Sequence, residues 1–298
     1  MFELSVGPVL YYWSRAELIR FYEAVGRSGV ASVGLGEIVC SRRHEMKLAD
    51  WMAVGRELRS AGKEVVIGTQ ALMESEADLR QARAWVDNGE FLVEANDAAA
   101  VRLAAERVPW VIGAYVNVYS SATLDEYVSL GAVRWVPPVE LSLSAVEQVN
   151  PGSARVSSEI HVFGRMPLAL SARCFTARHF DLPKDQCAFL CGNYPDGLNL
   201  QTREGQPFLA FNGIQTLSGA YLCLLPQAQA LRGTRIRRLR LSPCSQGFTR
   251  VIEVYEAVFN QGADAADAVR ELQSLGLPGP LANGYVYERH AGMAWEAS

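Results

Sequence analysis

Four of the six cysteines stand where their thiolates could act together. Cys40 is isolated, whereas Cys174, Cys187 and Cys191 fall within a span of eighteen residues. Four thiolates suit a tetrahedral Zn²⁺ or an iron–sulfur cluster. The spacing matches neither the common zinc-ribbon pattern nor the ferredoxin pattern, so four unrelated thiols remain an alternative.

The residues around the three clustered cysteines are basic. Arg173, Arg178 and Lys184 would lower the pKa of nearby thiols and offset thiolate charge, which favours ligands over inert core cysteines. Cys223 stands in an apolar run and is predicted to be a core residue on a helix. Cys244 has no partner in the sequence and is predicted to be structural.

Two carboxylates and one amide are candidates for contacts with a substrate. Glu37 and Glu140 each follow a predicted strand, where they could bind a hydroxylated substrate or transfer a proton. A structural salt bridge with an arginine is the alternative for both. Asn117 is a comparable polar candidate after another predicted strand.

Eight repeated strand–helix units are predicted to position these residues. Short apolar runs alternate with segments of helical period, as in a helix whose stripe is Leu18, Phe21, Tyr22 and Val25. This alternation predicts an α/β fold, a (β/α)8 TIM-type barrel. The strands are predicted near residues 4–6, 32–35, 65–68, 91–94, 110–114, 133–136, 160–163 and 237–241.

The chain is predicted to form a single domain over residues 1–298, because no linker-like stretch interrupts it. Residues from about 164 to 207 are too many for an ordinary loop and predict a cysteine-bearing insertion after strand seven. Residues from about 262 to 298 predict a tail with a helix at 263–275. Chemistry in such barrels collects at the carboxyl ends of the strands, so the candidate residues are expected on one rim.

Composition and charge restrict the classes of protein to which this chain can belong. The chain has 298 residues, 49% hydrophobic and 20% charged, which suits a folded globular protein. No apolar run of about 18 residues and no signal peptide is present, which predicts a cytoplasmic protein that is not an integral membrane protein. A net charge of −4 does not indicate the basic surface that binds nucleic acid, so no nucleic acid is expected as a partner.

The arginine-rich run at 232–240 predicts a solvated or salt-bridged edge, with contact to a partner as the alternative.

Signatures of hydrolytic and nucleotide-dependent enzymes are missing. The sequence contains neither an HExxH zinc motif nor a GxSxG nucleophile elbow, which argues against proteolysis. Gly34 and Gly36 lack the third glycine of a dinucleotide-binding fingerprint. His161 alternates with apolar residues and is predicted to be an interior histidine.

Several segments together resemble the collagenase-like peptidase family. They include residues 6–10, 35–43, 138–142 and 212–216, and above all the run Ala-Arg-Cys-Phe-Thr-Ala-Arg at 172–178 with its downstream cysteine pair. The resemblance implies an oxygen-sensitive 4Fe-4S cluster held by Cys40, Cys174, Cys187 and Cys191.

The resemblance also implies partners and an activity. It implies a heterodimer with a sister subunit and O2-independent hydroxylation in ubiquinone biosynthesis, with prephenate as oxygen donor and a lipid-carrier protein as a further partner. Glu37, Asn117, Glu140 and Arg178 would then orient the donor and the ring. Relatives that hydroxylate RNA bases, and a non-catalytic iron–sulfur subunit, are the alternatives.

Overall fold

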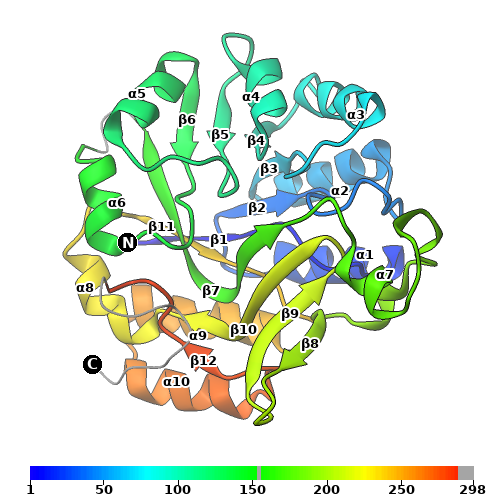
Figure 1. Cartoon of the computed structure of the whole chain (residues 1–298). Coiled ribbons are helices and arrows are strands. Elements are labelled where there is room, and N and C mark those ends of the chain that lie inside the picture. The colour runs from blue at the N-terminus through cyan, green and yellow to red at the C-terminus, as the bar shows by residue number, and fades with distance from the viewer. Residues whose placement is uncertain (153–155, 288–298) are drawn as a thin grey trace.

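Eight parallel strands close into a barrel in the computed structural model, which describes residues 1–152 and 156–287 (Figure 1). Each strand pairs with the next along the chain, and the last barrel strand pairs with both the seventh and the first, which closes the ring. The predicted (β/α)8 barrel is therefore confirmed. Its strands are β1 (Glu3–Val6), β2 (Ser32–Leu35), β3 (Glu64–Gly68), β4 (Leu92–Ala95), β5 (Trp110–Ile112), β6 (Ala132–Trp135), β7 (Ser157–Leu170) and β11 (Arg238–Leu241).

Helices cover the outside of the barrel. The first begins with a capping box in which Ser14 and Glu17 satisfy each other's backbone N–H groups, and it buries Leu18, Tyr22 and Val25 as its period predicts. Gly62 has a φ of +81° just after the second helix, the left-handed conformation that ends a helix. The covering helices are α1 (Arg15–Gly26), α2 (Leu48–Ser60), α3 (Glu76–Val86), α4 (Ala98–Ala104), α5 (Ser121–Ser129), α6 (Leu143–Val149) and α9 (Phe248–Asn260).

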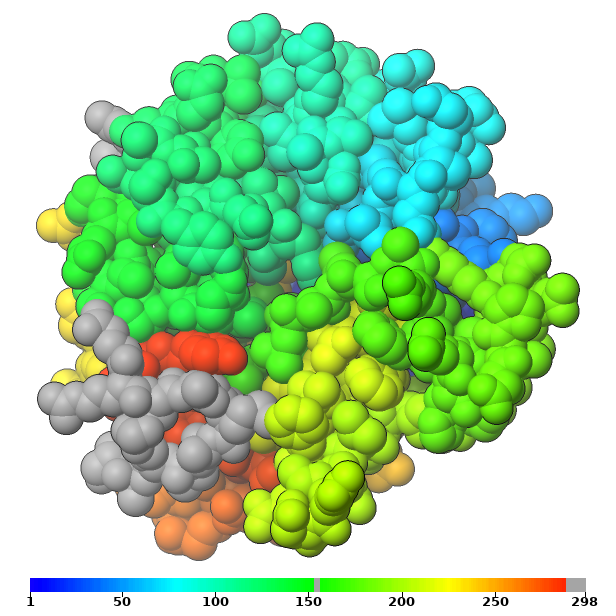
Figure 2. All heavy atoms as spheres, in the orientation of Figure 1, coloured from blue at the N-terminus to red at the C-terminus, as the bar shows by residue number. Residues whose placement is uncertain are grey.

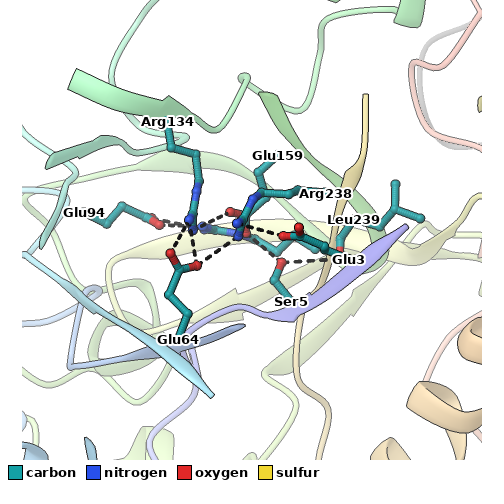
Figure 3. A network of polar contacts seen from close by, with 9 residues as sticks. Glu3, Ser5, Glu64, Glu94, Arg134, Glu159, Arg238 and Leu239 are labelled. Carbon is teal, nitrogen blue, oxygen red and sulfur yellow. Dashed lines mark hydrogen bonds and ion pairs between the residues drawn. The ribbon is translucent and has the colours of Figure 1, made fainter. Parts of the chain in front are cut away.

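Ion pairs fill one end of the barrel interior (Figure 3). Arg240 donates to Glu94 at 2.5 Å and to Glu159 at 2.7 Å, and Arg134 donates to Glu159 at 3.2 Å and to Glu64 at 2.6 Å. Buried charges are tolerated only when they are paired in this way. The salt-bridged interpretation of the arginine-rich run thus holds for Arg240, but this arginine lies inside the barrel and not at an outer edge.

The insertion after strand seven is an antiparallel sheet with short helices. β7 continues past the barrel to Leu170 and pairs with β10 (Gln215–Cys223), which pairs with β9 (Pro207–Asn212), and β9 pairs with β8 (Leu198–Gln201). The interruption therefore runs to residue 223, beyond the predicted end near 207, because β10 pairs with the extended β7 and β9 pairs with β10.

Short helices complete the insertion. They are α7 (Phe175–His179) and two 3₁₀ helices, η1 (Lys184–Gln186) and η2 (Leu190–Asn193). In Figure 2 the insertion, coloured bright green to yellow, lies against the blue and cyan segments. Arg42, after β2, donates to the carbonyl oxygen of Asp185 at 2.7 Å, and Lys184 pairs with Glu74. The insertion is thus fastened to loops that follow β2 and β3.

Two other predictions concern the sequence after the insertion. Cys223 is fully buried as predicted, but it lies on a strand and not on a helix, because a short apolar run has the same appearance in both. The predicted helix at 263–275 is present as α10 (Ala265–Ser274), followed by β12 (Leu281–Ala282), which pairs with β10. The remainder of the predicted tail, 288–298, lies outside the described residues.

A short 3₁₀ helix, η3 (Leu225–Gln227), and α8 (Ala228–Arg232) connect β10 to β11. Within residues 1–152 and 156–287, we find no helix of the length and apolar character that a bilayer crossing requires.

Candidate metal centre

The two cysteine-bearing segments meet at the carboxyl-end rim of the barrel, around the side chain of Arg43. Cys40 and Arg43 belong to the loop after β2, and Cys191 belongs to the insertion. The Arg43 guanidinium lies close enough to Cys40 and Cys191 to interact electrostatically with both thiols. Cys40 and Cys191 each also interact electrostatically with Cys174. Residues about 150 positions apart in sequence therefore share one site.

Burial is the main influence on the pKa of the thiols of Cys40 and Cys191. It raises the pKa of Cys40 and of Cys191, and Arg43 offsets part of each rise. Although burial alone would lower the pKa of Arg43, neighbouring Glu37, Cys191 and Cys40 raise it. The guanidinium is thus a permanent cation enclosed by acidic groups.

Cys174 and Cys187 lie at helix ends in the insertion. Cys174 precedes α7, and its sulfur accepts a 3.4 Å hydrogen bond from the N–H of Ala177. Cys187 follows η1, and Leu190 N donates to its carbonyl oxygen at 3.2 Å. Hydrogen bonds from N–H groups to sulfur, such as the one from Ala177 to Cys174, also tune the reduction potential of iron–sulfur clusters.

Two left-handed residues stand between Cys187 and Cys191. Ala188 and Phe189 have φ values of +47° and +52°, and each such non-glycine residue costs about 1–2 kcal/mol. The Phe189 ring lies 5.5 Å from that of Tyr12, which helps to hold this conformation. Backbone strain of this kind is common at ligand sites, where the surrounding structure enforces it.

The residues present suit a group of negative charge. Nε of Arg42 and Nε of Arg43 are buried and have no hydrogen-bond partner among the described residues. Such buried donors are costly unless an acceptor reaches them. Within residues 1–152 and 156–287, no three cysteine, histidine or carboxylate side chains lie close enough together to enclose a metal ion. The donor types fit a thiolate-bound cluster, whereas their present separation does not yet form its cage.

Glu37 is part of this site. Its Oε1 accepts hydrogen bonds from the N–H groups of Val39 and Cys40 at 3.0 and 3.1 Å, and lies 3.6 Å from Arg43 Nη1. Burial raises the pKa of Glu37, and Arg43 and the two N–H groups counteract the rise. Glu37 thus forms an ion pair with an arginine, which was the alternative to substrate binding for this residue. Its bonds to Val39 and Cys40 also fix the loop that carries Cys40.

Two of the other predicted substrate contacts, Asn117 and Glu140, lie on exposed rim loops, whereas Arg178 lies on α7 in the insertion, across the molecule from α5 and α6 (Figure 1). Asn117 follows β5 and Glu140 follows β6, and the hydroxyl of Tyr119 donates to Glu140. Arg178 is exposed on α7 and makes no ion pair within the described part of the chain. No hydrogen bond joins these residues to one another in that part of the chain.

Histidines contribute little to the cysteine site. His161 lies in the barrel wall, where burial, followed by the charge of Arg240, lowers its pKa to about 3. This agrees with the prediction of an interior histidine. The ring of His179 lies 4.8 Å from that of Phe180 on the surface of the insertion.

Sequence reasoning did not single out Arg43, Asn212 or Gln215, although all three lie in segments that carry the family resemblance. Asn212 accepts a hydrogen bond from Arg43 at 2.7 Å. An available signal was the Asn-Gly pair at 212–213 between two apolar runs, which is typical of a hairpin turn. Nothing in the local pattern indicates that an arginine 169 positions earlier fills its acceptor.

Comparison with known proteins identifies one protein family and several solved structures of low sequence identity. The sequence profile described as peptidase family U32 matches residues 20–291. Among solved structures, the spore cortex-lytic enzyme SleL of Bacillus megaterium is 10% identical, with a TM-score of 0.42, and 87% of this chain and 74% of that chain are covered. A putative dihydrodipicolinate synthase family protein of Coccidioides immitis is also 10% identical, with a TM-score of 0.40 and coverage of 91% and 77%. These scores add nothing to the fold assignment, which rests on the strand pairing.

Proposed function

Because the chain belongs to peptidase family U32, whose profile covers residues 20–291, we propose that it is an iron–sulfur protein of the UbiV type. In this proposal it is one subunit of an O2-independent hydroxylase of ubiquinone biosynthesis. Its partners are a UbiU-like sister subunit, in a heterodimer, and a lipid-carrier protein of the quinone pathway. Prephenate is the proposed oxygen donor.

The observation that carries the proposal is the environment of Arg43. The buried Arg43 guanidinium lies next to Cys40 and Cys191, and among the described residues Glu37 is the carboxylate that pairs with it, at 3.6 Å. Three or four cysteines that ionise on binding a cluster would place further negative charge beside this cation. Four cysteines of unrelated function would not require a cation buried among them.

Cys40, Cys174, Cys187 and Cys191 are the residues that would hold a 4Fe-4S cluster. When bound, the cluster supplies one-electron chemistry, which protein side chains alone do not provide. Glu37 holds the backbone of the Cys40 loop, and Arg43 offsets the charge of the thiolates.

Three exposed residues have proposed roles in binding. Arg178 carries five N–H donors and no ion-pair partner among the described residues, so it suits the carboxylate of an oxygen donor. Glu140 and Asn117, on the neighbouring rim loops, would orient the hydroxyl group of an aromatic ring. Proteolysis is not proposed, because the sequence has neither an HExxH nor a GxSxG motif.

The first experiment determines whether the cluster and the partner exist. The chain is co-expressed with the sister subunit, purified without oxygen and analysed for iron, acid-labile sulfide and electronic spectra. About four iron and four sulfide per chain are expected. Stoichiometric zinc without sulfide would overturn the assignment.

The second experiment determines the substrate. A deletion strain is grown without O2, and its quinones and modified RNA are measured by mass spectrometry. Loss of ubiquinone with accumulation of an unhydroxylated precursor is expected. Loss of a hydroxyl group from rRNA or tRNA would assign an RNA-base hydroxylase instead. Full turnover by the sister subunit alone would assign a non-catalytic role to this chain.

A further inference from the structure

The turn between β9 and β10 contacts both cysteine-bearing segments. Asn212 and Gln215 pair across it, and Gly213 occupies its first central position with a φ of +65°, the sign that a type II′ turn requires. A Cβ atom at Gly213 would lie 3.1 Å from Nη2 of Arg43. The turn therefore packs directly against the guanidinium, and glycine permits both its conformation and this approach.

On one side, the turn holds Arg43. Nη2 of Arg43 donates to Oδ1 of Asn212 at 2.7 Å, and Nη1 donates to the carbonyl oxygen of Leu10 at 2.9 Å. Nδ2 of Asn212 donates to the same carbonyl oxygen at 2.7 Å. Arg43 and Asn212 are 4% and 1% exposed. The three groups form a closed, buried set that fixes the guanidinium in one place.

On the other side, the turn holds the segment that begins α7. The N–H of Phe175 donates to the carbonyl oxygen of Gly213 at 2.8 Å, and the N–H of Gly213 donates to Oγ1 of Thr176 at 3.1 Å. The N–H of Ser171 donates to the carbonyl oxygen of Ile214 at 2.9 Å. Cys174 lies between these attachment points, so its backbone is fixed to the same turn as Arg43.

The turn is also anchored to the barrel. Nε2 of Gln215 donates to the hydroxyl of Tyr115 at 2.7 Å, and Oε1 of Gln215 faces Nδ2 of Asn212 at 3.3 Å. Tyr115 follows β5 on the barrel rim. A continuous polar chain thus runs from the barrel through the two amides to Arg43.

We propose that Asn212 is a positioning residue that holds the Arg43 cation beside Cys40 and Cys191. This inference rests on the proposed function and extends it. A fixed positive charge next to a cluster stabilises the form that has gained an electron, because the interaction is weakly screened in a buried site. Asn212 would therefore set the reduction potential of the cluster without touching it.

The central variant is Asn212→Leu, which keeps the approximate size of the side chain and removes both its acceptor and its donor. Asn199→Leu is the control, because Asn199 accepts a 2.8 Å bond from an arginine, Arg165, in the same insertion sheet, and no side-chain hydrogen bond joins it to a cysteine-bearing segment within the described residues. Arg43→Met and the double variant Asn212→Leu/Arg43→Met complete a double-mutant cycle. All four are prepared without oxygen together with the sister subunit.

Two quantities are measured. In metal-free protein labelled with ¹⁵N-arginine, the exchange of the Arg43 guanidinium protons is followed by NMR, and Asn212→Leu is expected to accelerate it at least tenfold, whereas Asn199→Leu is not. In cluster-loaded protein titrated with dithionite, Asn212→Leu is expected to shift the midpoint potential to more negative values at unchanged iron content. The same substitution is expected to cause no further shift when Met replaces Arg43.

Each outcome supports or overturns a separate statement. Unchanged proton exchange in Asn212→Leu would overturn the positioning role. An unchanged potential with full iron content, or an equal shift in the Arg43→Met background, would overturn the action through Arg43. Accelerated exchange in a chain that binds no iron would support the positioning of Arg43 and overturn the proposed function. If Asn212→Leu fails to fold, Asn212→Ser takes its place, because its short hydroxyl side chain also breaks the bond to Arg43.

Discussion

Oδ1 of Asn212 accepts a 2.7 Å hydrogen bond from Nη2 of Arg43, although the two residues are 169 positions apart. Both side chains are buried, so the bond is not exchanged for one with water. Through it, the insertion sheet and the loop after β2 share the geometry of one cation. Cys40 and Cys191, one from each segment, lie close to this cation.

The first prediction concerns the ligand set. Alanine at Cys40, Cys174, Cys187 or Cys191 should remove most of the bound iron, because each supplies a thiolate that no neighbour replaces. Cys223→Ala is the control, since burial raises the pKa of that thiol to about 11 and it lies on β10 in the core. Iron and sulfide are measured after anaerobic reconstitution. Full iron content in any of the four single variants would remove that cysteine from the set.

The second prediction concerns the partner. Co-expression with the sister subunit should give a 1:1 complex by size exclusion with light scattering. Leu168, Leu200 and Phe208 are exposed apolar side chains on the insertion sheet and are suitable contacts. Phe208→Asp should weaken the complex, whereas Val133→Asp, at the opposite end of the barrel, should not. A chain that stays at 32.7 kDa beside its sister subunit would contradict the prediction.

The third prediction concerns Arg178. Arg178→Lys should raise the KM for the oxygen donor with little change in kcat, because lysine keeps the charge but loses the paired N–H donors that match a carboxylate. Steady-state kinetics with the donor as varied substrate measures the effect. Arg107→Lys, on the far side of the barrel in an exposed pair with Asp87, should leave both constants unchanged. Equal effects of the two substitutions would remove Arg178 from the donor site.

The fourth prediction concerns the ion pairs in the barrel. Glu159→Gln should lower the free energy of unfolding by about 3–5 kcal/mol, because it leaves Arg240 and Arg134 without their shared buried carboxylate. Urea denaturation measures the change. Glu253→Gln breaks an exposed pair with Arg250 and should lower the free energy of unfolding far less, because solvent screens that pair. A similar loss of unfolding free energy in both variants would show that the buried ion pairs of Glu159 stabilise the chain no more than the exposed pair does.

The fifth prediction concerns the pH dependence of stability. The pKa of His161 is lowered to about 3 in the folded chain, whereas an unfolded chain binds the proton near pH 6.5. The contribution of His161 to stability is therefore present above pH 6.5 and is lost as the pH falls towards 3, by up to about 1.4 kcal/mol per pH unit. Denaturation of His161→Asn between pH 7 and 4 should show a flatter dependence than the unsubstituted chain. The exposed His179→Asn should keep the original slope, and identical slopes for all three proteins would refute the assignment.

The sequence by itself determined the repeated part of the fold and where its chemistry would gather. Strand and helix periods are local, so the eight strand–helix units can be predicted from the sequence without the structure. Because parallel strands share one carboxyl end, Glu37 and Cys40 could also be placed on a common rim before any coordinates.

Only the tertiary structure decided which distant groups meet. The sequence predicts Arg240 to lie at a solvated or salt-bridged edge, yet its partners Glu94 and Glu159 lie 146 and 81 positions away and take it into the barrel. The insertion sheet depended on the pairing of β7 with β10, and the place of Arg43 depended on Asn212 in the turn of that sheet. A buried charge or amide is stable only where a partner reaches it, and no local pattern of residues records which remote partner that is.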